Sequence, residues 1–218
     1  NLKKDEIMDV SPEAVEEIKA GRILIVIDDE NRENEGDFMV AAERVTPEII
    51  NFMARHGRGL ICLPTTKQRL EELDICMMVE GKTSLEDTPF TVSVDAANGV
   101  SSGVSALDRA ETARLFCNPN TTPEDFEKPG HLFPLRARDG GLLEREGHTE
   151  ATIDALRLAG LYPAGVLCEV LDDDGSMARL PRLIEIAEEH HLKIMAIKDL
   201  IEYRLNEELV QDFACSGG

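Results

Sequence analysis

The sequence predicts an α+β fold, a three-layer sandwich in which helices cover both faces of a mixed sheet. Short apolar runs with the length of strands alternate along the chain with segments that have helical periodicity. No stretch rich in Gly, Ser or Pro divides the chain, and no repeat recurs at a fixed period. With 218 residues, 42% of them hydrophobic, the chain is long enough to bury a sizeable core.

The expected elements can be placed from these patterns. Strands are predicted at 23–27, 37–42, 59–63, 90–94, 131–136, 165–171 and 193–197. Two helices begin with an N-cap residue followed by Pro and Glu, at Ser11 and at Thr46, and end near Gly21 and Gly57. Further helices are predicted at about 66–74, 105–117, 149–160, 179–191 and 198–208.

Without a linker, the chain is predicted to form a single domain over 1–218. Its core covers about 7–205, and 206–218 is either a tail or the start of a linker. The small, flexible segment 95–104 is either a loop over a site or a surface connection. The run 172–175, three Asp followed by Gly, is predicted to be a turn.

Composition narrows the possible functions. The formal net charge of −20 argues against nucleic acid and anionic membranes as partners, since both are bound through Lys and Arg. No apolar run approaches the roughly 20 residues of a membrane span, and the N-terminus lacks the apolar core of a signal peptide. The five cysteines form no CxxC pair and are odd in number, which indicates reduced thiols and a cytoplasmic protein.

The densest charge lies at 28–37, directly after the apolar run 23–27. Six of these ten residues are acids, and a second apolar run follows. Carboxylates crowded into one loop repel one another, and a hard cation such as Mg²⁺ or Ca²⁺ is a common way to offset that repulsion. The alternative is a solvated charged turn. We favour the cation because two strands deliver the loop to the edge of a sheet.

A second informative segment is 129–149, which holds two Gly-His pairs, Gly130-His131 and Gly147-His148. The second pair begins the predicted helix 149–160, with Thr149 as a plausible N-cap. Helix N-termini are anion sites, and Arg145 just upstream would add the bidentate partner that a phosphate prefers. His148 in the same turn could bind a cation held by the acidic loop.

A third element is Glu169, which lies inside the apolar strand predicted at 165–171. A carboxylate there is costly unless it is paired or functional, and partial burial would suit a general acid or base. The alternative is an outward-facing position on a half-exposed strand. Together the three elements describe a metal-assisted site that acts on a small phosphate ester.

Several of these segments closely resemble, in order along the chain, the signatures of the 3,4-dihydroxy-2-butanone 4-phosphate synthases, lyases of riboflavin biosynthesis. The resemblance covers about 7–205 and rests on 28–37, 105–109, 129–137, 145–151 and 165–169. It implies an α+β sandwich, a catalytic domain that needs Mg²⁺ or Mn²⁺, and a homodimer with sites near the subunit interface. The implied reaction converts D-ribulose 5-phosphate to L-3,4-dihydroxy-2-butanone 4-phosphate and formate.

The resemblance also implies roles for individual residues. Glu33 and His148 correspond to metal ligands. His131 and Glu169 correspond to essential catalytic groups. The implied substrate contacts are Arg32, Asp37, Arg145, Gly147, Thr149 and Glu169, with Arg145, Gly147 and Thr149 around the phosphate. The initiating base stays open between Asp37 and Glu35.

One departure from the family pattern is visible at 108–112, where Glu111 stands in place of an expected Thr. We expect Glu111 to be an exposed helix residue, which puts a phosphate contact from this turn in doubt. Ser102 and Ser105 are weaker candidates for it.

Two other function classes remain as alternatives. One is a non-catalytic RNA-associated module, which the net charge disfavours. The other is a metal-dependent phosphosugar isomerase or lyase with a different substrate. The family also occurs fused to a GTP cyclohydrolase II domain, and the sequence leaves open whether such a domain follows.

Overall fold

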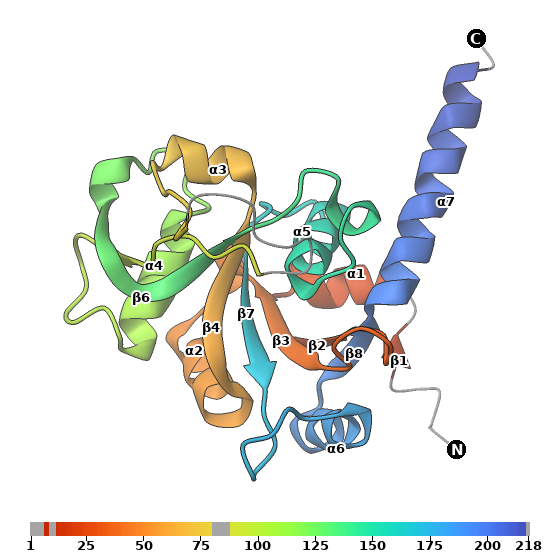
Figure 1. Cartoon of the computed structure of the whole chain (residues 1–218), viewed down its shortest axis with the longest axis horizontal. Helices are drawn as coiled ribbons and strands as arrows, with labels where there is room; N and C mark the ends of the chain where they lie inside the picture. The colour runs from red at the N-terminus through yellow and green to blue at the C-terminus, as the bar shows by residue number, and fades with distance from the viewer. Residues whose placement is uncertain (1–6, 9–11, 80–87, 217–218) are drawn as a thin grey trace.

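The computed structural model describes residues 7–8, 12–79 and 88–216 (Figure 1). Its described strands form one mixed sheet of eight, in the order β1-β8-β2-β3-β7-β4-β6-β5. Three neighbouring pairs, β1–β8, β2–β8 and β4–β6, are parallel, and the other four are antiparallel. The strands are β1 Ile7–Met8, β2 Leu24–Ile27, β3 Gly36–Ala41, β4 Arg58–Thr65, β5 Val94–Ala96, β6 Phe126–Arg136, β7 Gly165–Val170 and β8 Lys193–Ala196.

Helices cover both faces of this sheet, which confirms the predicted three-layer sandwich (Figure 1). On one face lie α1 (Pro12–Lys19), α5 (His148–Leu158) and the start of α7 (Ile197–Ser216). The other face carries α2 (Pro47–Phe52), α3 (Lys67–Glu72), α4 (Ala106–Leu115) and α6 (Leu180–His190).

Two apolar clusters, one on each face, hold the layers together. The alternation of strand side chains explains the division, because Ile25 and Phe38 point to one cluster while Leu24 and Met39 point to the other. All of these side chains are fully buried or nearly so. Central strands buried on both faces read as continuous apolar runs, as β2 does.

Most predicted strands match the structure within a residue or two, but three differences stand out. The two-residue β1 was not predicted, since two residues carry no periodicity. The strand predicted at 90–94 is shifted, because β5 is Val94–Ala96 while Phe90 and Thr91 make only isolated bridges. The strand predicted at 131–136 is the second half of the longer β6. The first half of β6 is mostly polar and exposed, so the sequence has no apolar strand pattern there.

The predicted helix signals are also found where the structure describes them. Thr46 caps α2 by accepting a hydrogen bond from the Ile49 N–H, and the following π-helical turn Met53–Gly57 ends at the predicted glycine. The proposed cap at Ser11 lies outside the described residues. The helix predicted at 198–208 runs on to Ser216 as α7. The Asp172–Gly175 run is a turn, with Gly175 at a φ of +86°.

The four described cysteines differ in burial. Cys62 and Cys168 are buried, Cys117 is partly buried and Cys76 is exposed, and these four described thiols are free. Among the described residues, no helix has both the length and the hydropathy needed to cross a bilayer.

The fold brings most of the predicted site residues together, at the place where the β2–β3 loop, the start of β3 and the end of β7 meet. Asp37, near the start of β3, pairs directly with Glu169 near the end of the antiparallel strand β7. The acidic loop joins β2 to β3, and α5 reaches it with its first residue, because the His148 Nδ1 lies 3.9 Å from the Glu33 carboxylate. Segments far apart in sequence therefore meet at one place.

Candidate active site

A cavity of about 310 Å³ opens between the acidic loop, the start of α5 and the ends of β3 and β7. Most of its lining residues are polar, and eight of the predicted site residues are among them. These eight are Arg32, Glu33, Glu35, Asp37, Arg145, His148, Thr149 and Glu169. The other lining residues are Leu60, Cys62, Thr88, Phe90, Leu135 and Leu167.

The acidic loop is organised by Asp28, whose side chain is only 1% exposed. Its Oδ1 accepts a hydrogen bond from the Glu35 N–H at 2.7 Å, and Oδ2 accepts one from the Glu33 N–H at 3.0 Å. Oδ2 also pairs with the Arg32 guanidinium at 2.9 Å. Asp28 therefore closes the loop on itself, and the loop is a folded structure with defined hydrogen bonds.

Arg179, just before α6, holds the loop from outside. Its guanidinium donates to the main-chain oxygens of Glu33 at 2.7 Å and Asn34 at 2.5 Å. Asn34 has a φ of +55°, a left-handed conformation that Asn tolerates better than most residues. This contact could not be predicted from the sequence, because Arg179 is 146 residues from Glu33.

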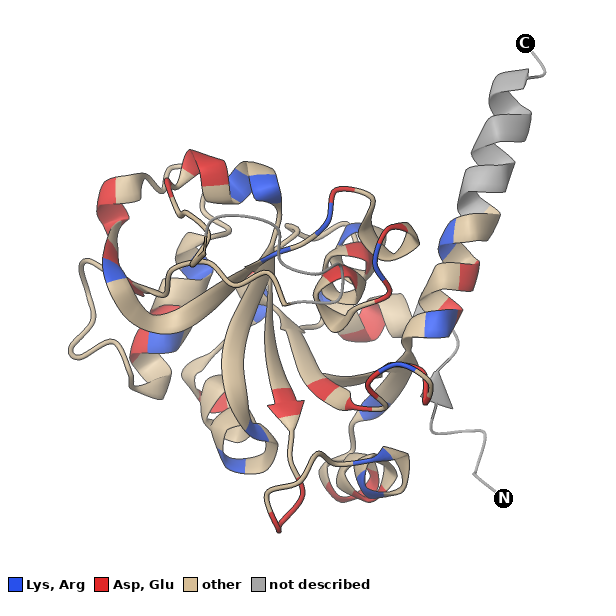
Figure 2. Cartoon of the chain, in the orientation of Figure 1, with Lys and Arg blue, Asp and Glu red and all other residues tan. Residues whose placement is uncertain are grey.

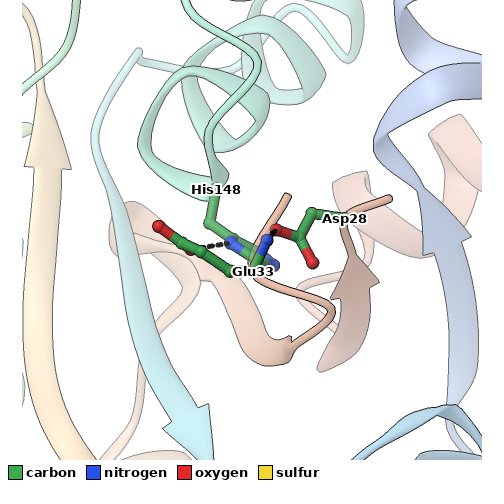
Figure 3. A group of neighbouring side chains, drawn as sticks. All are labelled: Asp28, Glu33 and His148. Carbon is green, nitrogen blue, oxygen red and sulfur yellow. Dashed lines mark hydrogen bonds and ion pairs between the residues drawn. The ribbon is translucent and has the colours of Figure 1, made fainter. Parts of the chain in front are cut away.

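Glu33, Asp28 and His148 converge from the loop and from the start of α5 (Figure 3). Each offers one ligand atom, and these atoms all lie within 4.8 Å of one another. The His148 Nδ1 is 3.9 Å from the Glu33 Oε2. His148 is buried, and in the described part of the chain its Nε2 has no hydrogen-bond partner.

A buried imidazole nitrogen without a partner beside two carboxylates is a suitable donor set for a divalent cation. The residues present therefore fit a metal ion. Because the oxygens of Asp28 already accept three hydrogen bonds within the loop, Glu33 and His148 are the more available donors.

Negative charge is concentrated at this end of the sheet, where the β2–β3 loop and the adjoining ends of β3 and β7 are acidic (Figure 2). The pKa of Asp37 is raised to about 7, mainly by burial; His148 opposes the shift, and the nearby carboxylates of Glu169, Glu35 and Glu33 contribute to it. Burial also raises the pKa of Glu35, with Glu33 adding to the effect. The cavity therefore contains one carboxyl group, Asp37, that can hold a proton near neutral pH.

The start of α5 forms the opposite wall of the cavity. Gly147 is its N-cap and His148 its first residue, so the predicted N-cap at Thr149 was wrong by two positions. The reason is that a glycine can take the cap position without a side-chain acceptor, and the sequence signal of Thr does not reveal this. The N–H groups in the first turn of a helix favour anions, so this turn stays a candidate anion site.

Arg145 lies over the same helix end and pairs with Glu150, which is fully buried, at 2.7 Å. The second oxygen of Glu150 accepts a hydrogen bond from the Arg138 N–H. Gly147 makes room for this arrangement, because a Cβ there would lie 2.0 Å from the Arg145 Nη1. Glu150 was not predicted as a site residue, and its buried pairing explains how Arg145 is held at the cavity.

Glu169 points from β7 into the cavity, and its Oε2 accepts a hydrogen bond from the Leu60 N–H at 2.8 Å. Glu169 is partly buried, and it is the one residue of β7 that is not fully buried. Leu60 is one of the lining residues that sequence reasoning missed, since its contribution is a main-chain donor.

Two predicted site residues, Gly147 and His131, are not among the residues that line this cavity; Gly147 adjoins it as the N-cap of α5, whereas His131 lies elsewhere. It lies on β6, with its side chain 48% exposed, and its Nδ1 is 2.7 Å from the Asp95 carboxylate. The second Asp95 oxygen accepts a hydrogen bond from the His131 N–H. The site expected from one chain is therefore divided between the cavity and this separate His131–Asp95 pair.

The segment 95–104 lies beside that pair. Asp108 organises it by accepting hydrogen bonds from Ser101 and from the Gly103 N–H. Ser105 caps α4 through the Asp108 N–H, and Ser102 is exposed, so neither serine lies at the cavity. Glu111 pairs with Arg114 on α4, with its side chain 43% exposed, as expected for a helix residue.

The family model and the most similar relatives point to the same family of proteins. A model of the 3,4-dihydroxy-2-butanone 4-phosphate synthase family matches residues 12–203. Riboflavin biosynthesis protein RibBA of Aquifex aeolicus is 55% identical over 206 residues, which make up 94% of this chain and 51% of that protein. RibBA of Cytophaga hutchinsonii is 56% identical over 208 residues, or 95% of this chain and 50% of that protein.

Solved structures agree with the fold. A 3,4-dihydroxy-2-butanone 4-phosphate synthase in complex with two magnesium ions is 40% identical, with a TM-score of 0.87 over 92% of this chain and 99% of that one. The synthase of Candida albicans is 45% identical, with a TM-score of 0.83 over 90% of this chain and 97% of that one. The chain spans about half the length of the curated relatives that it matches.

Proposed function

Because the chain belongs to the 3,4-dihydroxy-2-butanone 4-phosphate synthase family, we propose that it converts D-ribulose 5-phosphate to L-3,4-dihydroxy-2-butanone 4-phosphate and formate. The observation that carries the proposal is one cavity that combines three functions. It holds a candidate metal pair, Glu33 and His148, an acid–base pair, Asp37 and Glu169, and a helix N-terminus with Arg145. The alternative of an RNA-associated module has no comparable support.

The candidate metal ligands are Glu33 and His148, and the preferred ion is Mg²⁺. A bound divalent cation would polarise the carbonyl and hydroxyl oxygens of the ketose. Mg²⁺ commonly uses only one or two protein ligands, which agrees with two donors here. Mn²⁺ should substitute well, because imidazole is a better ligand for that softer ion.

Asp37 and Glu35 are the candidates for the base that removes the C3 proton. The raised pKa of Asp37, about 7, suits a group that accepts and returns a proton near neutral pH. Glu169, on the neighbouring strand, can hydrogen-bond a substrate hydroxyl and take part in the later proton transfers. Replacing Asp37 and Glu35 singly by the amides identifies the base, which is the variant that binds substrate but loses C3 proton exchange.

The phosphate of the substrate is proposed to bind at the start of α5, with Arg145, Gly147 and Thr149. Thr149 lines the cavity, and the first-turn N–H groups of α5 are available for an anion. Arg32 is a further substrate contact from the opposite wall, where Asp28 and Glu33 hold its guanidinium. These positively charged groups would offset the repulsion between the substrate phosphate and the surrounding carboxylates.

A homodimer with sites near the interface is the proposed assembly. This assembly would account for His131, which lies outside the cavity although the resemblance to the family implies that it is essential. Apolar side chains that are about half exposed include Leu60, which lines the cavity, and Val104, which follows the glycine packed against Asp95. Contact between two such surfaces would bury them and bring the His131 of one copy to the cavity of the other.

The remaining expectations stay predictions. We propose residues 1–218 as a single catalytic domain with its core at about 7–205; α7 crosses the end of that core without a break. A cytoplasmic location is supported by the free thiols of the described cysteines.

The test is formate release from D-ribulose 5-phosphate, measured with Mg²⁺ and then with excess chelator. We expect formate only with metal, and none from His148→Ala. A folded, metal-loaded wild type that releases no formate would overturn the proposed function. An isomerised phosphosugar without formate would support the alternative of a phosphosugar isomerase.

A further inference from the structure

The strand β4 contains a β-bulge directly opposite Glu169. Arg58 pairs with Val170, whereas Ile61 pairs with Cys168. Two residues of β4, Gly59 and Leu60, therefore face the single residue Glu169 of β7. A bulge bends its strand and redirects the groups beside it, and such bulges are common next to active sites.

The bulge gives Glu169 its hydrogen-bond donor. The Leu60 N–H points at the carboxylate and donates to Oε2 at 2.8 Å. Across the described part of the chain, no other donor contacts either oxygen of this carboxylate. A hydrogen bond to an ionised group is about twice as strong as one between neutral groups, so this contact fixes the orientation of the side chain.

The absence of a side chain at Gly59 makes room for that carboxylate. A Cβ at this position would lie 2.6 Å from the Glu169 Oε2, 2.5 Å from its main-chain oxygen and 2.8 Å from its Cβ. The φ of Gly59 is not in the left-handed region, so its backbone conformation is one that alanine adopts. Close approach to Glu169 is therefore the reason for glycine here.

Arg58 anchors the start of the bulge. It has a φ of +68°, which is unfavourable for a residue with a Cβ and has to be maintained by its surroundings. Its guanidinium donates to the main-chain oxygen of Asp172 at 3.0 Å and to the Asp173 carboxylate at 2.7 Å. The loop after β7 thus holds the bulge in register with Glu169.

We propose that the bulge at Gly59 and Leu60 is a positioning element for the Glu169 carboxylate. The Leu60 N–H holds Oε2, and Oε1 is left for the substrate. Gly59 and Leu60 are positioning residues, since they act through Glu169. The inference rests on the proposed function, because Glu169 is taken as the group that touches the substrate.

The kinetic test is Gly59→Ala, in wild type and in Glu169→Ala. Displacing a catalytic group by about 1 Å can cost about 100-fold, so we expect kcat to fall by about that factor. Mn²⁺ binding at Glu33 and His148 should be unchanged. In the Glu169→Ala background the same substitution should cost less than about threefold, because no carboxylate is left to displace.

Gly57→Ala is the matched control. A Cβ at Gly57 would be crowded by the Cys168 Sγ at 2.8 Å and by the main-chain oxygen of Glu169 at 3.1 Å, but not by the Glu169 carboxylate. It should lower the melting temperature as Gly59→Ala does, yet keep kcat near wild type. An equal loss of kcat from Gly59→Ala in both backgrounds would overturn the inference, since the effect would not pass through Glu169.

A second readout does not depend on activity. In the ¹⁵N-labelled protein, the Leu60 amide proton should resonate far downfield and move upfield in Glu169→Ala and Gly59→Ala, but not in Gly57→Ala. If the chemical shift of the Leu60 amide proton did not change in Glu169→Ala, the inference would also be overturned. If wild type releases no formate, the proposed function fails, and this resonance alone then decides whether the bulge holds the carboxylate.

Discussion

Asp37 and Glu169 are direct partners on the antiparallel strands β3 and β7, so two carboxyl groups face the same cavity from adjacent positions. Two neighbouring carboxylates in a buried place do not ionise independently, and burial is the main reason why the pKa of Asp37 rises to about 7. Within this pair, the more exposed Glu169 has a main-chain donor, whereas Asp37 is almost fully buried.

This pair makes stability depend on pH. Because the pKa of Asp37 is higher in the folded chain than its ordinary value of 3.8, the folded state holds a proton that the unfolded state has lost. The stability contributed by neutral Asp37 is complete below about pH 4 and is lost as pH rises through about 7. Asp37→Asn, which stays neutral, should therefore be the more stable protein at pH 8.

The difference is measurable by urea unfolding in the presence of chelator. The gain in the free energy of unfolding should grow from near zero at pH 4 to between about 1 and 4 kcal/mol at pH 8. A gain that is the same at both pH values would show that the charge of Asp37 is not its cause.

The metal site can be tested by removing one ligand at a time. Glu33→Gln and His148→Ala should each weaken Mn²⁺ binding by about 10-fold or more, as measured by the electron paramagnetic resonance of free Mn²⁺. Glu30→Gln is the control, because Glu30 is exposed in the same loop and carries the same charge. If Glu30→Gln weakened binding equally, general loop charge would be responsible.

The buried pair of Arg145 and Glu150 should be important for both stability and substrate binding. Glu150→Ala leaves a buried guanidinium without its carboxylate, which typically costs about 3 kcal/mol and lowers Tm by about 10 °C. The released Arg145 should also raise KM. Glu146→Ala, an exposed neighbour, should change neither quantity by much. A Glu150→Ala protein as stable as wild type would contradict the pairing.

The proposed sharing of sites between two copies predicts complementation. His131→Ala and Glu169→Gln should each keep only a small residual activity alone. Mixed after dissociation, they should regain about a quarter of wild-type activity, because half of the dimers contain one intact site of two. No recovery from a mixture with proven exchange of subunits would place both residues in the same chain's site.

The fold was largely predictable because its central strands are continuous apolar runs and its helices have clear caps. Strand β2 and the Thr46 cap are examples. β1 and the first half of β6 were not predictable, because a two-residue strand and a polar strand have no apolar pattern and form only through their neighbours in the sheet.

The candidate site divides in a similar way. Glu33, Asp37 and Glu169 stand out in the sequence, because dense or misplaced charge needs an explanation. Arg179 and Leu60 do not, since one acts on a loop far away in sequence and the other only through its N–H. The separation of His131 from the cavity was equally hidden, because sequence spacing does not show which face of the molecule a strand presents.

The central claim is the excision of one carbon from a phosphoketose. In the proposed reaction this carbon is C4, which leaves as formate, so the direct measurement uses D-ribulose 5-phosphate labelled with ¹³C at C4. With Mg²⁺ present, ¹³C NMR should show the label leaving the sugar and entering formate, with no labelled four-carbon product. Label that stays in a sugar phosphate, while the enzyme is folded and metal-loaded, would contradict the account.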